Sequence, residues 1–348
     1  MTSSQTAQGA EPPHPAPSGP ERPAPAPWRT LTSLLNRFGG TPILGPLGGL
    51  VLLGICFSIL SPVFLTLGNI SQIFQQVMEV GTLAVGQTLI IIAAGIDLSN
   101  GAIMVLGSIV MAKMAVQGTP VPLAIVAGLA VTTGLGLING LVVARVRLPP
   151  FIVTLGMLNV AYSSTLLYTN QAAVDNLPSA LLFLGGTLAL GPIYLPVGPV
   201  VMVIVVAIIW YVLTQTAWGR HVYVAGNNIE AARLAGINTT RLLLSIYLVA
   251  GLIYGIAALL VLGRTTVGDP NAGQTDNLDS ITAVVIGGTS LFGGRGSVVG
   301  TLIGALIVGV IRNGLTLVGV DALWQTFATG IIVVVAVAVD QATRRRRR

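Results

Sequence analysis

Few side chains in this 348-residue sequence could do covalent chemistry or hold a transition metal. There is one cysteine, Cys56, and there are two histidines, His14 and His221. A zinc site draws several cysteine or histidine ligands together, and a serine–histidine–aspartate triad needs a histidine beside its serine. His14 lies in a proline-rich head and Cys56 lies in an apolar run, so we expect no catalytic residue, no metal site and no intrachain disulfide.

The glycine-rich segment GGTSLFGGRG, residues 287–296, invites comparison with a phosphate-binding loop. Such a loop continues into Lys-Ser or Lys-Thr after its last glycine, and a dinucleotide fingerprint sits between a strand and a helix with fixed spacing. Neither pattern is met. We therefore expect no cofactor on this chain, and any ATP and Mg²⁺ that drive its work would be bound by another polypeptide.

Polar residues interrupt two apolar runs in AAGIDLSNGAIM, residues 93–104. Asp97 or Ser99 could cap the helix that follows. Irregular backbone at membrane depth also survives only where protein or a water-filled cavity covers it, and a buried aspartate there often belongs to a transport pathway. The two interpretations are compatible. The candidates for a pathway or gate are Asp97, Ser99, Asn100, Gly287, Gly288, Gly293 and Gly294.

A short polar helix is predicted in NNIEAARLAGIN, residues 227–238, between long apolar stretches. Asn227 or Asn228 can cap its start, Glu230 suits its first turn and Gly236 can end it. About seven residues are too few for an isolated helix, which becomes marginal in water only at roughly 12–15. The helix must therefore dock, either on its own domain or in a groove of a partner.

The composition is that of an integral membrane protein. Hydrophobic residues make up 53% of the chain and charged residues only 8%, whereas soluble domains carry about 25% charged residues. The net charge of +6 comes mostly from RRRRR at 344–348, which favours a cytoplasmic membrane surface over nucleic acid. Glu79 stands alone at the edge of an apolar run, where it could either reach the interface or act as an ion ligand.

We expect an all-α, polytopic fold with about ten transmembrane helices, each near 20 residues. Both termini and the arginine-containing loops then fall on the cytoplasmic side. The expected spans are 43–61, 79–97, 100–117, 121–144, 151–169, 196–214, 242–263, 279–292, 297–312 and 325–340, of which the eighth and ninth could be half-helices.

The expected domain organisation has three parts. Residues 1–40 form a proline- and alanine-rich, disordered cytoplasmic tail, 41–341 form the transmembrane domain with a cytoplasmic loop at 215–241, and 342–348 form a basic tail. Within the domain, Gly296, Gly300 and Gly304 recur every four residues, a pattern that lets helix backbones approach closely.

Four blocks of the sequence resemble a known family. GRHVYVAGNNIEAARLAGI (219–237) resembles the coupling loop of bacterial ATP-binding cassette permeases, whose Glu-Ala-Ala element inserts into the ATPase. The blocks 86–102, 137–158 and 278–315 resemble ribose/xylose/galactose-type permeases, in the same order along the chain. Asn100 departs from the family pattern, which has a small residue after GIDLS.

The resemblance implies the membrane subunit of a monosaccharide importer at the bacterial cell membrane. It implies two inverted five-helix halves, a second permease copy, a cytoplasmic ATPase and an extracytoplasmic sugar-binding protein. Branched-chain amino-acid and nucleoside permeases share cousins of these blocks, and an ion-coupled carrier using Glu79 and Asp97, or a non-transporting scaffold, stays open. The residues that the resemblance assigns to coupling are Glu230, Ala231, Ala232, Arg233 and Gly236.

Overall fold

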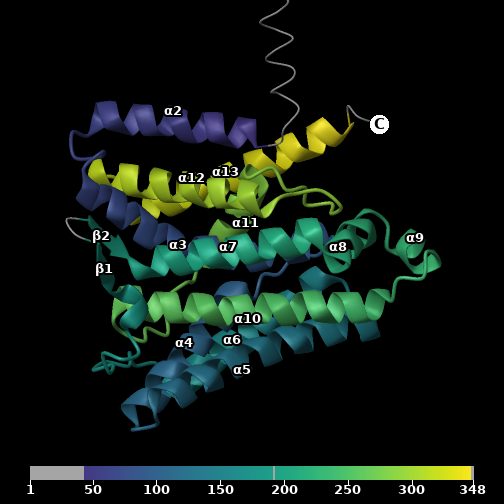
Figure 1. The fold of residues 1–348 in the computed structure, drawn as a ribbon, viewed down its shortest axis with the longest axis horizontal. Coiled ribbons are helices and arrows are strands. Elements are labelled where there is room, and N and C mark those ends of the chain that lie inside the picture. Colours follow the sequence, from purple (N-terminus) through teal and green to yellow (C-terminus); the bar gives the residue numbers. More distant parts are fainter. Residues whose placement is uncertain (1–42, 191–192, 346–348) are drawn as a thin grey trace, which may run out of the picture. The chain divides into compact units, whose positions relative to one another are not determined.

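The computed structural model describes residues 43–190 and 193–345, whose regular secondary structure is helical apart from one small hairpin (Figure 1). In the hairpin, β1 (Thr187–Leu190) pairs with β2 (Ile193–Pro196) in antiparallel register. The expected helical membrane architecture is thus found. The expected tail 1–40 and the last three arginines of the expected basic tail lie outside the described residues.

Twelve α-helices are described, together with the short turns η1 (Val142–Val146) and η2 (Phe183–Gly185). They are α2 (Leu44–Leu60), α3 (Leu67–Ile92), α4 (Asn100–Val116), α5 (Val121–Leu141), α6 (Pro150–Thr169), α7 (Val197–Gln215), α8 (Ala217–Asn227), α9 (Ile229–Leu234), α10 (Thr239–Thr265), α11 (Asp276–Ile286), α12 (Val298–Leu317) and α13 (Ala322–Arg345).

The centre of the domain is the pair α3 and α10, which pack against each other (Figure 1). Helices α4 and α5 contact α10 on one side, and α11 and α12 contact α3 on the other. The last two turns of α3 are fully buried, as are Tyr254 and most of the second half of α10. An apolar helix buried on all sides is expected at the core of a membrane bundle.

Within the described part of the chain, five helical stretches are long and apolar enough to cross a membrane. These are 121–146, 150–169, 197–215, 239–265 and 298–317, while α2 and α4 are apolar but shorter. Helix α11 has 11 residues and spans only about 16 Å, roughly half of a bilayer core. The count of about ten spans therefore stays a prediction.

Several expected boundaries were wrong. Helix α3 begins at Leu67 and ends at Ile92, so the expected span 79–97 misses about three turns and includes irregular chain. The expected span 279–292 runs past the end of α11 at Ile286. Helix α12 continues to Leu317 and is a full-length helix, because the polar residues Arg312 and Asn313 find partners inside the bundle.

Close backbone approach marks the glycines of α12 and of the segment before it. A Cβ on Gly300 would collide with the carbonyl oxygen of Gly287, and one on Gly304 would collide with that of Ala283. A Cβ on Gly296 would instead meet the side chain of Thr289, at 2.4 Å. Helices α11 and α12 thus touch at their backbones, which only residues without side chains allow.

Replacing Gly300 by alanine should destabilise the protein, because the new methyl group has no room beside Gly287. Overpacking of this kind typically costs about 1–3 kcal/mol. Thermal unfolding in detergent measures the effect. The matched control is Gly134→Ala in α5, where a Cβ would meet nothing within 4 Å. Equal unfolding temperatures for the two variants would contradict the close α11–α12 contact.

Candidate functional site

A buried hydrogen-bond network closes the irregular segment between α3 and α4. Asp97 accepts two bonds at Oδ1 from Ser99, one from the backbone N–H at 2.7 Å and one from the hydroxyl at 2.5 Å. Its Oδ2 accepts a bond of 3.1 Å from the hydroxyl of Tyr254 on α10, and Asn139 of α5 donates to the Ser99 hydroxyl at 2.9 Å. All four side chains have no exposed surface.

The backbone of this segment is satisfied from three further helices. Thr154 of α6 donates to the carbonyl of Ile96 at 3.0 Å, and Asn277 of α11 donates to that of Leu98 at 3.2 Å. The Gln87 amide of α3, oriented to satisfy both its ends, bonds the N–H and C=O of Asp97. Irregular backbone is thus held entirely by protein, as burial in an apolar layer requires.

Neither Asp97 nor Ser99 caps α4 in the expected way. Ser99 occupies the N-cap position but makes no side-chain bond to the helix, and the Asp97 carboxylate bonds Ser99 itself. The Asn100 side chain instead accepts a bond of 2.6 Å from the N–H of Gly101 and donates to the Ser280 hydroxyl at 2.7 Å.

Two helix N-termini meet at this point. A Cβ on Gly101 in α4 would lie 2.9 Å from the carbonyl oxygen of Gly273 and 3.3 Å from the backbone nitrogen of Asn277, at the start of α11. Both helices present the positive ends of their dipoles here. Asp97 before α4, and Asp276 and Asp279 in the first turn of α11, place three carboxylates around the junction. Discontinuous helices with this arrangement form the central sites of many transporters.

The expected short helix is present as α9, with six residues. The Asn228 side chain caps it by accepting bonds of 3.0 Å from the N–H groups of Glu230 and Ala231. Gly236 follows with φ +85°, the left-handed conformation that ends helices and that side chains tolerate poorly. The expected loop 215–241 also contains α8, whose start at Thr216 is capped by a bond from Gly219 N–H.

One side chain of α9, that of Ala232, is buried against the rest of the domain. Ala232 is fully buried, whereas Leu234 is 84% exposed. Glu230 and Arg233 form an exposed ion pair at 2.9 Å, and Ala231 and Ala235 are exposed as well. The outward face of α9 thus carries an exposed leucine, small residues and one ion pair.

A junction of backbones connects α8 to the irregular segment. The N–H of Gly294 donates to the carbonyl of Ile92 at 2.8 Å, and a Cβ on Gly226 would collide with that same carbonyl oxygen. A Cβ on Gly293 would lie 2.6 Å from the carbonyl oxygen of Gly226 and 2.7 Å from Ala94. The end of α3, the end of α8 and the glycine segment 287–296 are therefore in mutual contact.

Tyr223 of α8 strengthens this junction. Its hydroxyl donates to the carbonyl of Gly296 at 2.9 Å, and burial raises the pKa of the phenol, so it stays a donor at physiological pH. Gly288 is exposed at the end of α11, with φ +87°. Of the glycine candidates, Gly293 and Gly294 thus lie at the junction, while Gly287 packs on α12.

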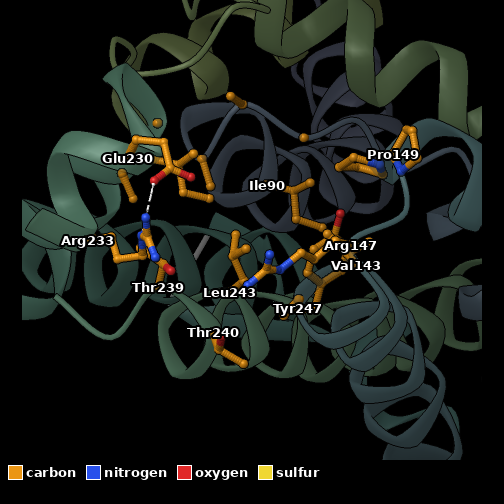
Figure 2. A pocket seen from close by; sticks show the side chains of 18 of the residues that line it. Ile90, Val143, Arg147, Pro149, Glu230, Arg233, Thr239, Thr240, Leu243 and Tyr247 are labelled. Atoms are coloured by element: carbon orange, nitrogen blue, oxygen red, sulfur yellow. Dashed lines mark hydrogen bonds and ion pairs between the residues drawn. The ribbon is translucent and has the colours of Figure 1, made fainter.

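A cavity of about 520 Å³ lies beside the junction. Figure 2 shows the Glu230–Arg233 ion pair on one side of it and Ile90, Val143 and Arg147 on the other. Tyr247 also lines the cavity, and its buried hydroxyl has no hydrogen-bond partner among the described residues. Side chains of α9 and of the first half of α10 face each other across the cavity.

The sequence did not identify the partners of Asp97. Tyr254, Asn139 and Gln87 lie in long apolar helices, where a single polar residue gives no periodic signal. A polar residue inside an apolar helix does indicate a buried polar contact, because polar groups within a bilayer pair with one another. It does not indicate which residue is the partner. Among the described residues, no group of three metal-ligating side chains comes together.

Tyr254→Phe should lower the thermal unfolding temperature, because it removes a hydrogen bond to a buried carboxylate, typically worth about 1.5–3 kcal/mol. Tyr247→Phe is the matched control on the same helix, since it removes a buried hydroxyl without a partner and should be neutral or stabilising. Unfolding in detergent compares the two. Equal destabilisation by both variants would show that the Asp97 bond contributes nothing specific.

Residues 69–337 match the family described as branched-chain amino acid transport system / permease component. No solved structure gives a significant match.

Curated relatives cover most of the chain. The fructose import permease protein of Rhizobium meliloti is 46% identical over 325 residues, 91% of this chain and 90% of its own. The ribose import permease protein of Bacillus subtilis is 42% identical over 86% of this chain and 92% of its own. The xylose transport system permease protein of Escherichia coli is 35% identical over 81% and 87%. The chain belongs to the permease-component family of branched-chain amino acid transport systems.

Proposed function

We propose that this protein is the transmembrane subunit of an ATP-binding cassette importer and forms the translocation pathway for a monosaccharide. The supporting observation is that relatives at 34–46% identity over at least 81% of the chain carry names of fructose, ribose, galactose or xylose import permeases. The helical architecture also suits a transport subunit that makes and breaks no covalent bond, because the chain breaks between α3 and α4 and before α11 inside the domain.

The importer would contain this chain twice, or this chain with a related permease. Separate cytoplasmic ATPase subunits would bind ATP and Mg²⁺, and an extracytoplasmic binding protein would deliver the sugar. The protein would reside in the bacterial cell membrane with both termini cytoplasmic, about ten spans and two inverted halves. Support for this orientation comes from Arg220, Arg233 and Arg241 around α9, under the positive-inside rule.

Helix α9 is proposed as the contact with the ATPase. Its outward face is exposed, whereas Ala232 packs on the domain and Asn228 fixes its start. A helix in the groove of a partner uses such a small, exposed face with a few anchors. Movement of α9 would reach the segment 93–99 through α8 and the backbone junction, and ATP-driven closure would then shift the balance between inward- and outward-open states.

An ion-coupled carrier is less well supported by the geometry. Glu79, expected at the interface or as an ion ligand, is 4% exposed and bound by Arg264 at 2.6 and 2.9 Å. Both oxygens of Asp97 already accept bonds from protein donors. Import of a branched-chain amino acid remains the second candidate because of the family description, and the substrate test below separates it from sugar import.

Glu230→Lys combined with Gly236→Val should release the ATPase from the purified complex. The lysine places a cation at the positive helix end, and the β-branched valine clashes with the left-handed conformation that ends α9. Both positions are exposed, so the membrane domain should still fold. Co-purification of the ATPase and uptake of labelled fructose and leucine in proteoliposomes measure the effect.

The control is Thr240→Ser, in the first turn of α10, directly after the segment that follows α9. A separate test of the orientation adds the ATPase to the outside of sealed, right-side-out vesicles, where it should not bind.

If the double variant retains the ATPase and imports sugar at the rate of the Thr240→Ser control, α9 only packs on its own domain. Uptake of leucine in place of sugar would favour the second candidate.

A further inference from the structure

A second cavity, here named the charged cavity, lies far from α9. It has a volume of about 310 Å³, near the lower limit of roughly 300–1,000 Å³ for small-molecule sites. Arg264, which lines it, is 25 residues along α10 from Thr239, or about 37 Å along the helix axis. The polar and charged residues of its lining include Gln76, Glu79, Arg264, Asp276, Arg312 and Thr326.

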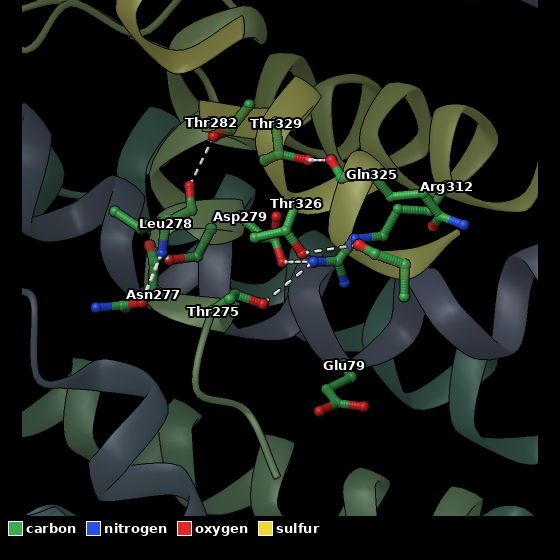
Figure 3. A network of polar contacts seen from close by, with 12 residues as sticks. Glu79, Thr275, Asn277, Leu278, Asp279, Thr282, Arg312, Gln325, Thr326 and Thr329 are labelled. Carbon is green, nitrogen blue, oxygen red and sulfur yellow. Dashed lines mark hydrogen bonds and ion pairs between the residues drawn. The ribbon is translucent and has the colours of Figure 1, made fainter. Parts of the chain in front are cut away.

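Two ion pairs fix the charged groups in place. Arg264 donates twice to Oε2 of Glu79, at 2.6 and 2.9 Å. Arg312 donates from Nη2 to Oδ2 of Asp279 and to the Thr275 hydroxyl, as Figure 3 shows together with the position of Glu79. These bonds leave Oε1 of Glu79 and Nη1 of Arg312 outside the ion pairs. The cavity thus has a donor in Arg312 and an acceptor in Glu79, whose carboxyl group also shares a hydrogen bond with Asp276.

The lining is balanced in charge. The carboxyl groups of Glu79, Asp276 and Asp279 stand against Arg264 and Arg312, and the hydrogen bond between Asp276 and Glu79 requires a proton on one of the two. With that proton the cluster has no excess of either sign. Gln76, Thr316 and Thr326 add uncharged groups that donate and accept. An apolar ligand would leave these groups without partners at considerable cost. A neutral molecule with many hydroxyl groups matches them, because each hydroxyl donates one bond and accepts others.

Asp276 adds a separate indication of unfulfilled hydrogen bonding. The residue is 7% exposed, and its Oδ2 has no partner in the described part of the chain. A buried carboxylate with an unpaired oxygen is costly, so its persistence beside the cavity indicates a role beyond packing.

We propose that the charged cavity binds the transported monosaccharide, with Glu79 accepting from its hydroxyl groups and Arg264 and Arg312 donating to them. This inference rests on the proposed function. The site is a weak one, because a substrate in a pathway must leave as readily as it enters. It lies between α3, α12 and α13, at the opposite end of α10 from α9, where the proposed orientation places delivery of the sugar.

Protection of a cysteine tests the site in the complete importer. The single native cysteine, Cys56, is exposed and is first replaced by serine. Thr326→Cys then places a thiol at the exposed rim of the cavity, with loss of only a bond to Ala322 within the same helix. Gln274→Cys is the matched control, because it is exposed and lines a different cavity.

Millimolar fructose or ribose should slow the reaction of the cysteine at position 326 with a small thiol reagent, and leave that at position 274 unchanged. Adding Glu79→Gln should raise the sugar concentration needed for protection roughly tenfold, as expected for loss of a hydrogen bond to a charged group. Arg312→Lys, which keeps the charge but loses the planar fork, should act in the same direction if the first variant folds poorly.

Absence of protection by any sugar, or equal protection at both positions, overturns the inference. If sugar uptake continues in either case, the proposed function stands while the site is wrong. Protection and uptake with leucine in place of sugar would instead contradict both proposals.

Discussion

Backbone N–H and C=O groups between Ile92 and Asn100 must find partners within the protein, because an apolar layer offers them no water. This constraint organises the centre of the domain. Gln87, Thr154 and Asn277 reach the segment from three helices, while Tyr254 satisfies the carboxylate of Asp97. With Asn139 of α5, five helices thus bond to one stretch of chain; they are α3, α5, α6, α10 and α11. A change in the conformation of this stretch would alter its contacts with all five.

The same segment is the place where the proposed coupling helix can act. Gly294 bonds the carbonyl of Ile92, and Gly226 lies directly against it, so α8 has no flexible side chain between itself and the end of α3. Contacts between backbones transmit small displacements because neither partner can rotate away. In this proposal α9 moves into the cavity beside it, and the hydrogen-bond network around Asp97 is the part of the domain that its movement changes.

Local sequence was sufficient for features that depend on local chemistry. Asn228 caps α9 and Gly236 is left-handed after it, as the spacing NNIEAARLAG predicts, because caps involve residues only a few positions apart. The high share of apolar residues and the low share of charged residues indicated a helical membrane protein, because composition requires no knowledge of long-range contacts. Helix α8 was missed, since its 11 residues include glycines at 219 and 226 whose value lies in close packing rather than helix propensity.

Long-range pairing could not be read from one sequence. The partners of Glu79 and Asp279 are 185 and 33 residues away, and nothing in the chain around either acid specifies an arginine. Glu79 was expected to reach the interface or to act as an ion ligand. It is buried, as Asp279 is, because a matched guanidinium group removes the need to reach water. The contact between the N-termini of α4 and α11 could not be predicted for the same reason. The sequence around each helix start indicates that a helix begins there, but not which other helix lies beside it.

We expect α8 to move the segment 93–99 through the backbone contact at Gly226. The direct test is import by the assembled transporter carrying Gly226→Ala, with Gly68→Ala, which meets nothing within 4 Å, as the control. Because α9 stays exposed, the Gly226 variant should retain the ATPase at the control's level while uptake of sugar falls by roughly tenfold or more, as a displacement costing over 1.4 kcal/mol implies. Unchanged uptake with the ATPase bound would contradict the account.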